Sequence, residues 1–194
     1  MSVVSDLVEY QGVKMTAREK ENLLSGMNAP ALRRLSPGTK LYRVADAARS
    51  RSEAFQIAGE AGAWWTGQKA FGKMLQYCIQ QDKEDRGLGY AAREACAVLF
   101  GWSSCDLLVE AYVKKNVQVF HGTGNPMSET RGGSTVTFGG WADIEQWFIP
   151  GLTEVVSTGG DNKRVQLNAH GNSVIEVYRT CSLRSAMDSA TSYR

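Results

Sequence analysis

The sequence lacks long apolar runs, a strong excess of either charge and a basic leader. Lys, Arg, Asp or Glu interrupts every apolar stretch, so no segment resembles a membrane-spanning helix of about 20 apolar residues. The N-terminus, MSVVSDLVEYQGVK, has neither the basic start nor the apolar core of a signal peptide. A formal net charge of +2, spread along the chain, predicts no strong binding to nucleic acid or anionic membranes.

Metal-binding spacing is also missing. The four cysteines show neither CxxC spacing nor a neighbouring histidine cluster. We therefore expect no metal, and buried free thiols in a reducing compartment. What the sequence does have is 194 residues with 43% hydrophobic content, which is enough for one compact domain with a sizeable core.

The first half of the chain carries most of the helix signals. Thr16 and Glu19 have the spacing of a capping box, and the helix that they begin should end near Gly26 and Pro30. The stretch GTKLYRVAD then alternates as a strand that carries Arg43 on a defined face. A helix is expected over 50–62.

An aromatic strand and further helices follow. GAWWTG is a short strand that runs directly into QKAFGKMLQYCIQ, whose apolar residues recur at helical spacing. QDKEDRGLG reads as a charged surface turn, and YAAREACAVLFG as another helix. This order predicts a strand, a turn and two helices.

The second half is rich in strand signals. Strands are expected over 107–113 and 117–121, then NPMSETRGGS as an open loop, then STVTF, EQWFI, TEVVS and NSVIEVYR as strands. The ending SLRSAMDSATSYR reads as a weakly ordered tail. Helices early and strands late predict an α+β fold with antiparallel pairing, because the later connections are too short for crossovers.

Three separated motifs stand in a meaningful order: LYRVAD, then AWWTGQKAF, then a Gly-Gly loop leading to EQWFIP. This order resembles the ADP-ribosyltransferase fold, including its bacterial toxin and effector branches and the NAD-hydrolysing toxins built on it. The resemblance covers about residues 39–157. It implies a split sheet core around an NAD cleft, with a leader helix over 1–38, a catalytic domain over 39–180 and a tail over 181–194.

The resemblance also implies roles for three residues. Arg43 would hold the phosphate and ribose of NAD, Thr66 would support the site, and Gln146 would contact the nicotinamide ribose. Arginine presents a planar fork of donors suited to a diphosphate. Cleavage builds positive charge on the sugar, so acceptors for the ribose 2-OH and nearby negative charge favour it.

Further contacts to NAD are expected from the same strands and the following helix. Val44, Trp65 and Phe71 are the candidates, with one of the two neighbouring tryptophans stacking on the nicotinamide. The alternative is that these aromatic residues fill an ordinary core, as aromatic residues usually do.

The catalytic position departs from the usual acid of the family, because counting back from Pro150 places it on Gln146. Side chains alternate along a strand, so Gln146 and Glu145 face opposite sides. If the strand is regular, Gln146 contacts the ribose and water completes the cleavage. If the loop is bulged, Glu145 swings inward and supplies negative charge.

Other polar residues receive plainer interpretations. His121 is expected to be a polar residue at a strand end, since no acid stands at a spacing that would orient it. Glu110 and Glu176 alternate with apolar neighbours, which predicts solvent-facing positions on half-buried strands.

The function expected is a mono-ADP-ribosyltransferase that consumes NAD as its substrate and modifies a macromolecular target. NAD glycohydrolysis is the alternative, and a catalytically inactive nucleotide- or protein-binding module of the same fold is the second. The loop over 132–144 is a candidate platform for an acceptor. The resemblance implies a toxin or effector in the cytoplasm of a target cell, reached by secretion without a cleaved signal peptide, with a protein target or an immunity protein as partner.

Overall fold

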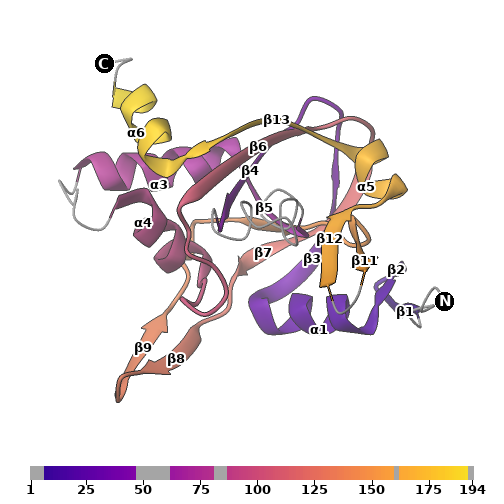
Figure 1. Ribbon diagram of the computed structural model, residues 1–194, viewed down its shortest axis with the longest axis horizontal. Coiled ribbons are helices and arrows are strands. Elements are labelled where there is room, and N and C mark those ends of the chain that lie inside the picture. Colours follow the sequence, from indigo (N-terminus) through magenta and orange to yellow (C-terminus); the bar gives the residue numbers. More distant parts are fainter. Residues whose placement is uncertain (1–6, 47–61, 81–86, 160–161, 192–194) are drawn as a thin grey trace.

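The computed structural model describes residues 7–46, 62–80, 87–159 and 162–191 (Figure 1). Its centre is a seven-stranded sheet in the order β13-β6-β4-β5-β10-β7-β3, in which each neighbouring pair is antiparallel. The α+β class with antiparallel pairing is therefore confirmed. The strands of this sheet are β3 (Met27–Leu35), β4 (Lys40–Ala45), β5 (Trp64–Gly67), β6 (Leu107–Val113), β7 (Val117–Gly124), β10 (Gln146–Phe148) and β13 (Ile175–Ser182).

Three two-stranded hairpins and several helices surround the central sheet. Figure 1 shows the β8–β9 hairpin projecting from the body of the molecule. The hairpins are β1 (Leu7–Tyr10) with β2 (Val13–Thr16), β8 (Met127–Arg131) with β9 (Ser134–Phe138), and β11 (Thr153–Gly159) with β12 (Asn162–Leu167). The helices are α1 (Ala17–Gly26), α3 (Gln68–Gln80), α4 (Gly87–Cys96), α5 (Ala169–Val174) and α6 (Leu183–Thr191). None of these helices is long and apolar enough to cross a membrane.

Both faces of the sheet are covered by apolar packing. On one face, α3, α4 and α6 pack around Tyr42 and Leu108, while α1 packs around Phe120 and Phe148. The opposite face packs around Trp65 and other residues of the strand interiors. Each fully buried Leu or Phe side chain contributes about 1.5–3 kcal/mol, so these clusters hold the strands in register.

The capping box predicted at the start of α1 is confirmed. Thr16 Oγ1 accepts a hydrogen bond from Glu19 N at 3.1 Å, and Glu19 Oε2 accepts one from Thr16 N at 2.9 Å. The other carboxylate oxygen of Glu19 accepts a hydrogen bond from Gly151 N at 2.7 Å, so the cap also ties α1 to the chain after β10.

The central sheet opens between β4 and β5. These strands pair only at Leu41 with Gly67 and at Tyr42 with Thr66. Beyond that point β4 continues along β6 as far as Ala45, whereas β5 continues along β10. Thr66 Oγ1 donates a hydrogen bond to the Tyr42 carbonyl at 3.1 Å, which closes the fork at its base.

Several segments differ from the expectations. Residues 27–35 form an edge strand of the central sheet, so the segment 1–38 is more than a leader helix packed on the domain. A hairpin replaces the open loop over 125–134 because Gly132 and Gly133 adopt the positive φ of a tight turn. Helix α6 occupies the expected tail, and α5 runs through Val174, so the strand expected over 172–179 begins only at Ile175. The helix expected over 50–62 lies, except for its last residue, outside the described residues.

Candidate functional site

A cavity of about 190 Å³ lies at the fork between β4 and β5. Residues from β4, β5 and β10, from the end of α4 and from the loop after α4 line it. They include Tyr42, Arg43, Thr66, Cys96, Trp102 and Gln146. The structure therefore brings together the three residues that the motif order singles out, although Arg43 and Gln146 are about a hundred positions apart in the chain.

Arg43 is an incompletely paired cation in this pocket. Its Nη1 donates a hydrogen bond to the Trp64 carbonyl at 3.1 Å, but its Nε is fully covered and has no partner in the described part of the chain. Burial lowers the pKa of Arg43 to about 10, so the guanidinium stays charged at neutral pH. A buried cation that is incompletely paired is costly, which makes an anionic ligand a natural partner for Arg43.

Gln146 and Thr66 lie side by side on neighbouring strands. Gln146 is opposite Thr66, which is opposite Tyr42, so the three side chains stand on one face of the sheet. Gln146 is only 5% exposed, and its Nε2 donates a hydrogen bond to the Cys96 carbonyl at 3.3 Å. With the amide nitrogen turned to Cys96, its oxygen is the acceptor that Gln146 offers to a ligand.

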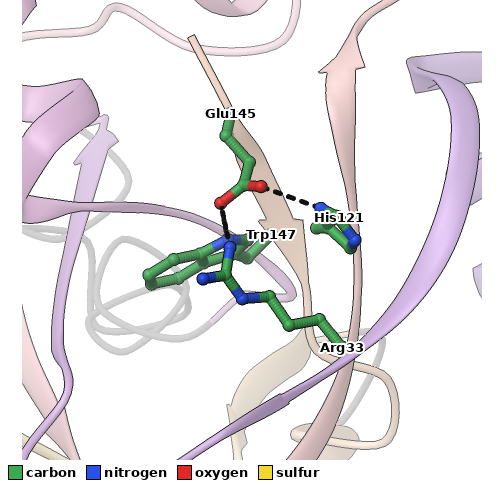
Figure 2. Close-up of polar contacts among 4 residues, drawn as sticks. All are labelled: Arg33, His121, Glu145 and Trp147. Carbon is green, nitrogen blue, oxygen red and sulfur yellow. Dashed lines mark hydrogen bonds and ion pairs between the residues drawn. The ribbon is translucent and has the colours of Figure 1, made fainter.

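Glu145 lies on the face opposite Gln146 and does not line the pocket. Its carboxylate accepts hydrogen bonds from Trp147 Nε1 and Arg33 Nη1, both at 2.7 Å, and contacts His121 Nδ1 at 2.8 Å (Figure 2). β10 begins at Gln146 and pairs with both neighbours without a register shift, and the contacts of Glu145 hold its side chain away from the pocket, unlike in the bulged alternative. The regular strand is what turns Gln146, and not Glu145, to the pocket.

These contacts also set the electrostatics of Glu145. Partial burial raises its pKa, but the hydrogen bonds from Trp147 and His121 and the charge of Arg33 outweigh this, so the pKa is lowered overall. The plain interpretation of His121 missed its acid partner, because the two residues are 24 positions apart and meet only through the pairing of β7 with β10.

The remaining candidates divide into lining and supporting residues. Val44 and Trp65 line the pocket, together with Trp64. Phe71 does not line it and instead stacks on Tyr42, with ring centroids 4.5 Å apart and planes within 6°. It therefore supports a pocket wall from behind.

The expectation for Glu110 was wrong. Its side chain is buried, and its carboxylate accepts hydrogen bonds from Tyr178 Oη at 2.9 Å and Arg179 Nη1 at 2.8 Å. Alternation along β6 could not reveal this, because the covering residues come from β13 at the far end of the chain.

Sequence reasoning missed part of the lining, namely Asp46, Cys96, Trp102 and Ser103. Asp46 is the only carboxylate among the lining residues that the structure describes. Its place at the end of β4, three residues after Arg43, was an available signal. Cys96 ends α4, and Trp102 and Ser103 lie in the loop after it, so all three meet the pocket only in the folded chain.

The pocket chemistry excludes a thiolate nucleophile near neutral pH. Burial, with the neighbouring Cys105, raises the pKa of Cys96 to about 12, and burial also raises that of Cys105. The described residues include no group of three or more His, Cys, Asp or Glu that could hold a metal ion. What remains is a cation, a neutral amide, a carboxylate and aromatic walls, a set suited to a phosphorylated sugar carrying a planar base.

No protein-family model matches the sequence, and no curated protein matches it. Two solved structures are similar to the chain, each at 12% sequence identity. Rhs1-CT in complex with its cognate immunity protein RhsI1 has a TM-score of 0.46, with 82% of this chain and 86% of that chain covered. Tne2 in complex with Tni2 has a TM-score of 0.38, with 76% and 91% covered. Similarity of this degree does not establish a shared fold or activity.

Proposed function

We propose that this chain binds NAD in the forked pocket and hydrolyses its nicotinamide-ribose bond. The observation that carries the proposal is the convergence of Arg43, Thr66 and Gln146 on one cavity, which Glu145 does not line because Arg33, His121 and Trp147 hold it elsewhere. The motif order alone left open which of Gln146 and Glu145 meets the ribose, and the regular pairing of β10 favours Gln146.

Arg43 would bind the diphosphate. Its guanidinium is charged, and its covered Nε has no acceptor among the described residues. A diphosphate oxygen would accept charge-assisted hydrogen bonds from the guanidinium where it lines the pocket, in a site shielded from water. The bond between Nη1 and the Trp64 carbonyl holds the fork of donors in place before the ligand arrives.

Gln146 would orient the nicotinamide ribose. Its amide oxygen would accept a hydrogen bond from the 2-OH, and Thr66 would hold the strand beside it. When the bond between C1 of the ribose and the nicotinamide nitrogen breaks, the electron pair leaves with nicotinamide. The oxygen of a water molecule then bonds to C1, and its proton is released to solvent.

The size of the pocket limits how much of NAD it encloses. Its volume of about 190 Å³ is below the ~300–1,000 Å³ of pockets that enclose drug-sized ligands. It would therefore enclose one end of the dinucleotide and leave the other over the pocket mouth. The motif resemblance assigns the enclosed end to the nicotinamide ribose.

Hydrolysis is favoured over transfer to a macromolecule because Gln146 is neutral and Glu145 is held away by three side chains. A catalytic carboxylate at that position would activate an acceptor, whereas an amide supplies only a hydrogen bond. A toxin or effector role in the cytoplasm of a target cell, with an immunity protein as partner, remains part of the proposal on the motif resemblance alone.

The test incubates purified protein with NAD, with and without cell lysate, and follows nicotinamide, ADP-ribose and labelled macromolecules. Nicotinamide with an equal amount of free ADP-ribose, and no labelled target, is the expected result. Arg43→Ala should abolish nicotinamide release, whereas Arg33→Ala, which removes an arginine that does not line the pocket, should retain it. A labelled product that needs lysate would indicate a transferase, and no loss of NAD would refute enzymatic function.

A further inference from the structure

The loop over 97–105, between α4 and β6, forms part of the pocket wall and is unusually constrained. Ala97 and Cys105, at its two ends, both have a φ of 53°, a left-handed conformation that non-glycine residues rarely adopt. Such a conformation persists where the surrounding structure determines it, and it is found preferentially at ligand sites.

A buried arginine, Arg93 of α4, holds the loop from within. Its Nη1 donates a hydrogen bond to the Leu99 carbonyl at 3.0 Å, and its Nη2 donates one to the Ser103 carbonyl. Its Cζ also lies 4.3 Å from the centroid of the Phe100 ring. These contacts fix both halves of the loop to one rigid side chain.

The β8–β9 hairpin holds the same loop from outside. Glu129 accepts hydrogen bonds from Phe100 N at 2.7 Å and Gly101 N at 3.2 Å. Arg131, also on β8, lies with its Cζ 5.3 Å from the Phe100 ring centroid. The turn is closed by a hydrogen bond from Trp102 N to the Leu99 carbonyl at 3.1 Å.

The contacts of Arg93 and Glu129 with the loop together hold one large side chain, that of Trp102, at the pocket. Trp102 lines the cavity and is nevertheless 47% exposed, whereas Trp65 and Trp147 are buried in the core. The core therefore does not account for the position of Trp102. An aromatic ring held half in water, on a loop fixed at both ends, is prepared to stack on a flat ligand with little loss of conformational freedom.

We propose that Trp102 is a base-stacking platform that binds a planar heteroaromatic ring of the dinucleotide at the pocket mouth. This inference rests on the proposed function and adds the residue that recognises a base. Nicotinamide and adenine share the flat π-face that stacks on indole, and the ligands used in the test distinguish them.

The experiment measures dissociation constants for three ligands by calorimetry. The first is ADP-ribose, whose only base is adenine. The second is nicotinamide mononucleotide, whose only base is nicotinamide. The third is an NAD analogue that cannot be cleaved, because carbon replaces the ring oxygen of its nicotinamide ribose. Trp102→Ala should weaken the binding of the analogue, and of one of the two fragments, about 5- to 100-fold. Trp102→Phe, which keeps a flat ring, should stay within about threefold of the wild type.

Kinetics and fluorescence provide readouts that loop damage alone would not reproduce. In Trp102→Ala the KM for NAD should rise by the same factor while kcat changes little, because stacking contributes equally to ground and transition states. The analogue should quench tryptophan fluorescence less in Trp102→Phe than in the wild type. Val155→Ala, which truncates an exposed apolar residue of the β11–β12 hairpin, is the control and should change neither the KM for NAD nor the fluorescence quenching.

Unchanged affinity of Trp102→Ala for all three ligands, in a wild-type protein that binds them, would overturn the stacking role and leave the proposed cleavage standing. An equal loss in Trp102→Phe and Trp102→Ala would also overturn it, because a flat ring would then not be the determinant. Failure of the wild type to bind any of the three ligands would overturn both proposals.

Discussion

Replacing Arg43 by methionine should abolish NAD cleavage and make the protein more stable. Methionine has a flexible unbranched side chain of similar length, so it can fill the same space. It removes a charged group that has one hydrogen bond to the Trp64 carbonyl and a covered Nε without a partner among the described residues. In the absence of ligand, Arg43 is therefore a functional group kept at the expense of stability.

The magnitude follows from the pKa of Arg43, which burial lowers from its ordinary value to about 10. This corresponds to about 3 kcal/mol of destabilisation of the charged form. A base whose folded pKa is depressed destabilises the fold at every pH below that pKa, so the full effect applies at neutral pH. Loss of the hydrogen bond to the Trp64 carbonyl destabilises the variant by about 1 kcal/mol. The net gain is about 1–2 kcal/mol, or about 4 °C in Tm for a chain of this size.

Arg93→Met is the matched control, because Arg93 is also a buried arginine beside the pocket. It donates hydrogen bonds to backbone carbonyls of the loop over 97–105, so its removal leaves those carbonyls unpaired and should cost about 3 kcal/mol or more. Urea unfolding at neutral pH measures both variants, and nicotinamide release measures activity. A destabilised Arg43→Met that still cleaves NAD would refute the reasoning.

Two further substitutions test the two faces of β10, and a labelling experiment tests the pocket thiol. Gln146→Glu places a carboxyl at a position that is 5% exposed, where burial raises the pKa of that carboxyl. The variant protein should therefore keep its stability at about pH 4, where the carboxyl is neutral, and lose stability as the pH rises to about 8, as measured by urea titrations. Glu145→Gln should keep NAD cleavage within about threefold, because this side chain does not line the pocket, and should cost less than about 1 kcal/mol of stability because the carboxylate is partly exposed. Since the pKa of Glu145 is lowered in the fold, that difference should be present at neutral pH and disappear on acidification through about pH 4; a difference that grows on acidification would contradict it. Cys96, with a pKa raised to about 12, should resist iodoacetamide at neutral pH until the protein unfolds, as measured by mass spectrometry.

Much of the fold could be predicted from local patterns. The strands β4, β5, β6 and β7, and the helices α1 and α3, lie where alternation, capping and helical spacing place them. The misses share one cause, which is dependence on distant partners. β3 is a strand because β7 pairs with it, and α6 is ordered through its packing on α4 and β6.

The candidate site was predictable to a similar extent. Alternation along β10 determined, from sequence alone, that Gln146 and Glu145 face opposite sides, because successive side chains of a strand must point in opposite directions. Only the tertiary structure decided which side carries the pocket. The fork between β4 and β5, the partners of Glu145 and the loop that presents Trp102 all depend on residues far apart in the chain, whose meeting is set by strand register and helix packing. Local geometry fixes the direction of a side chain, and the packing of distant segments decides what that side chain meets.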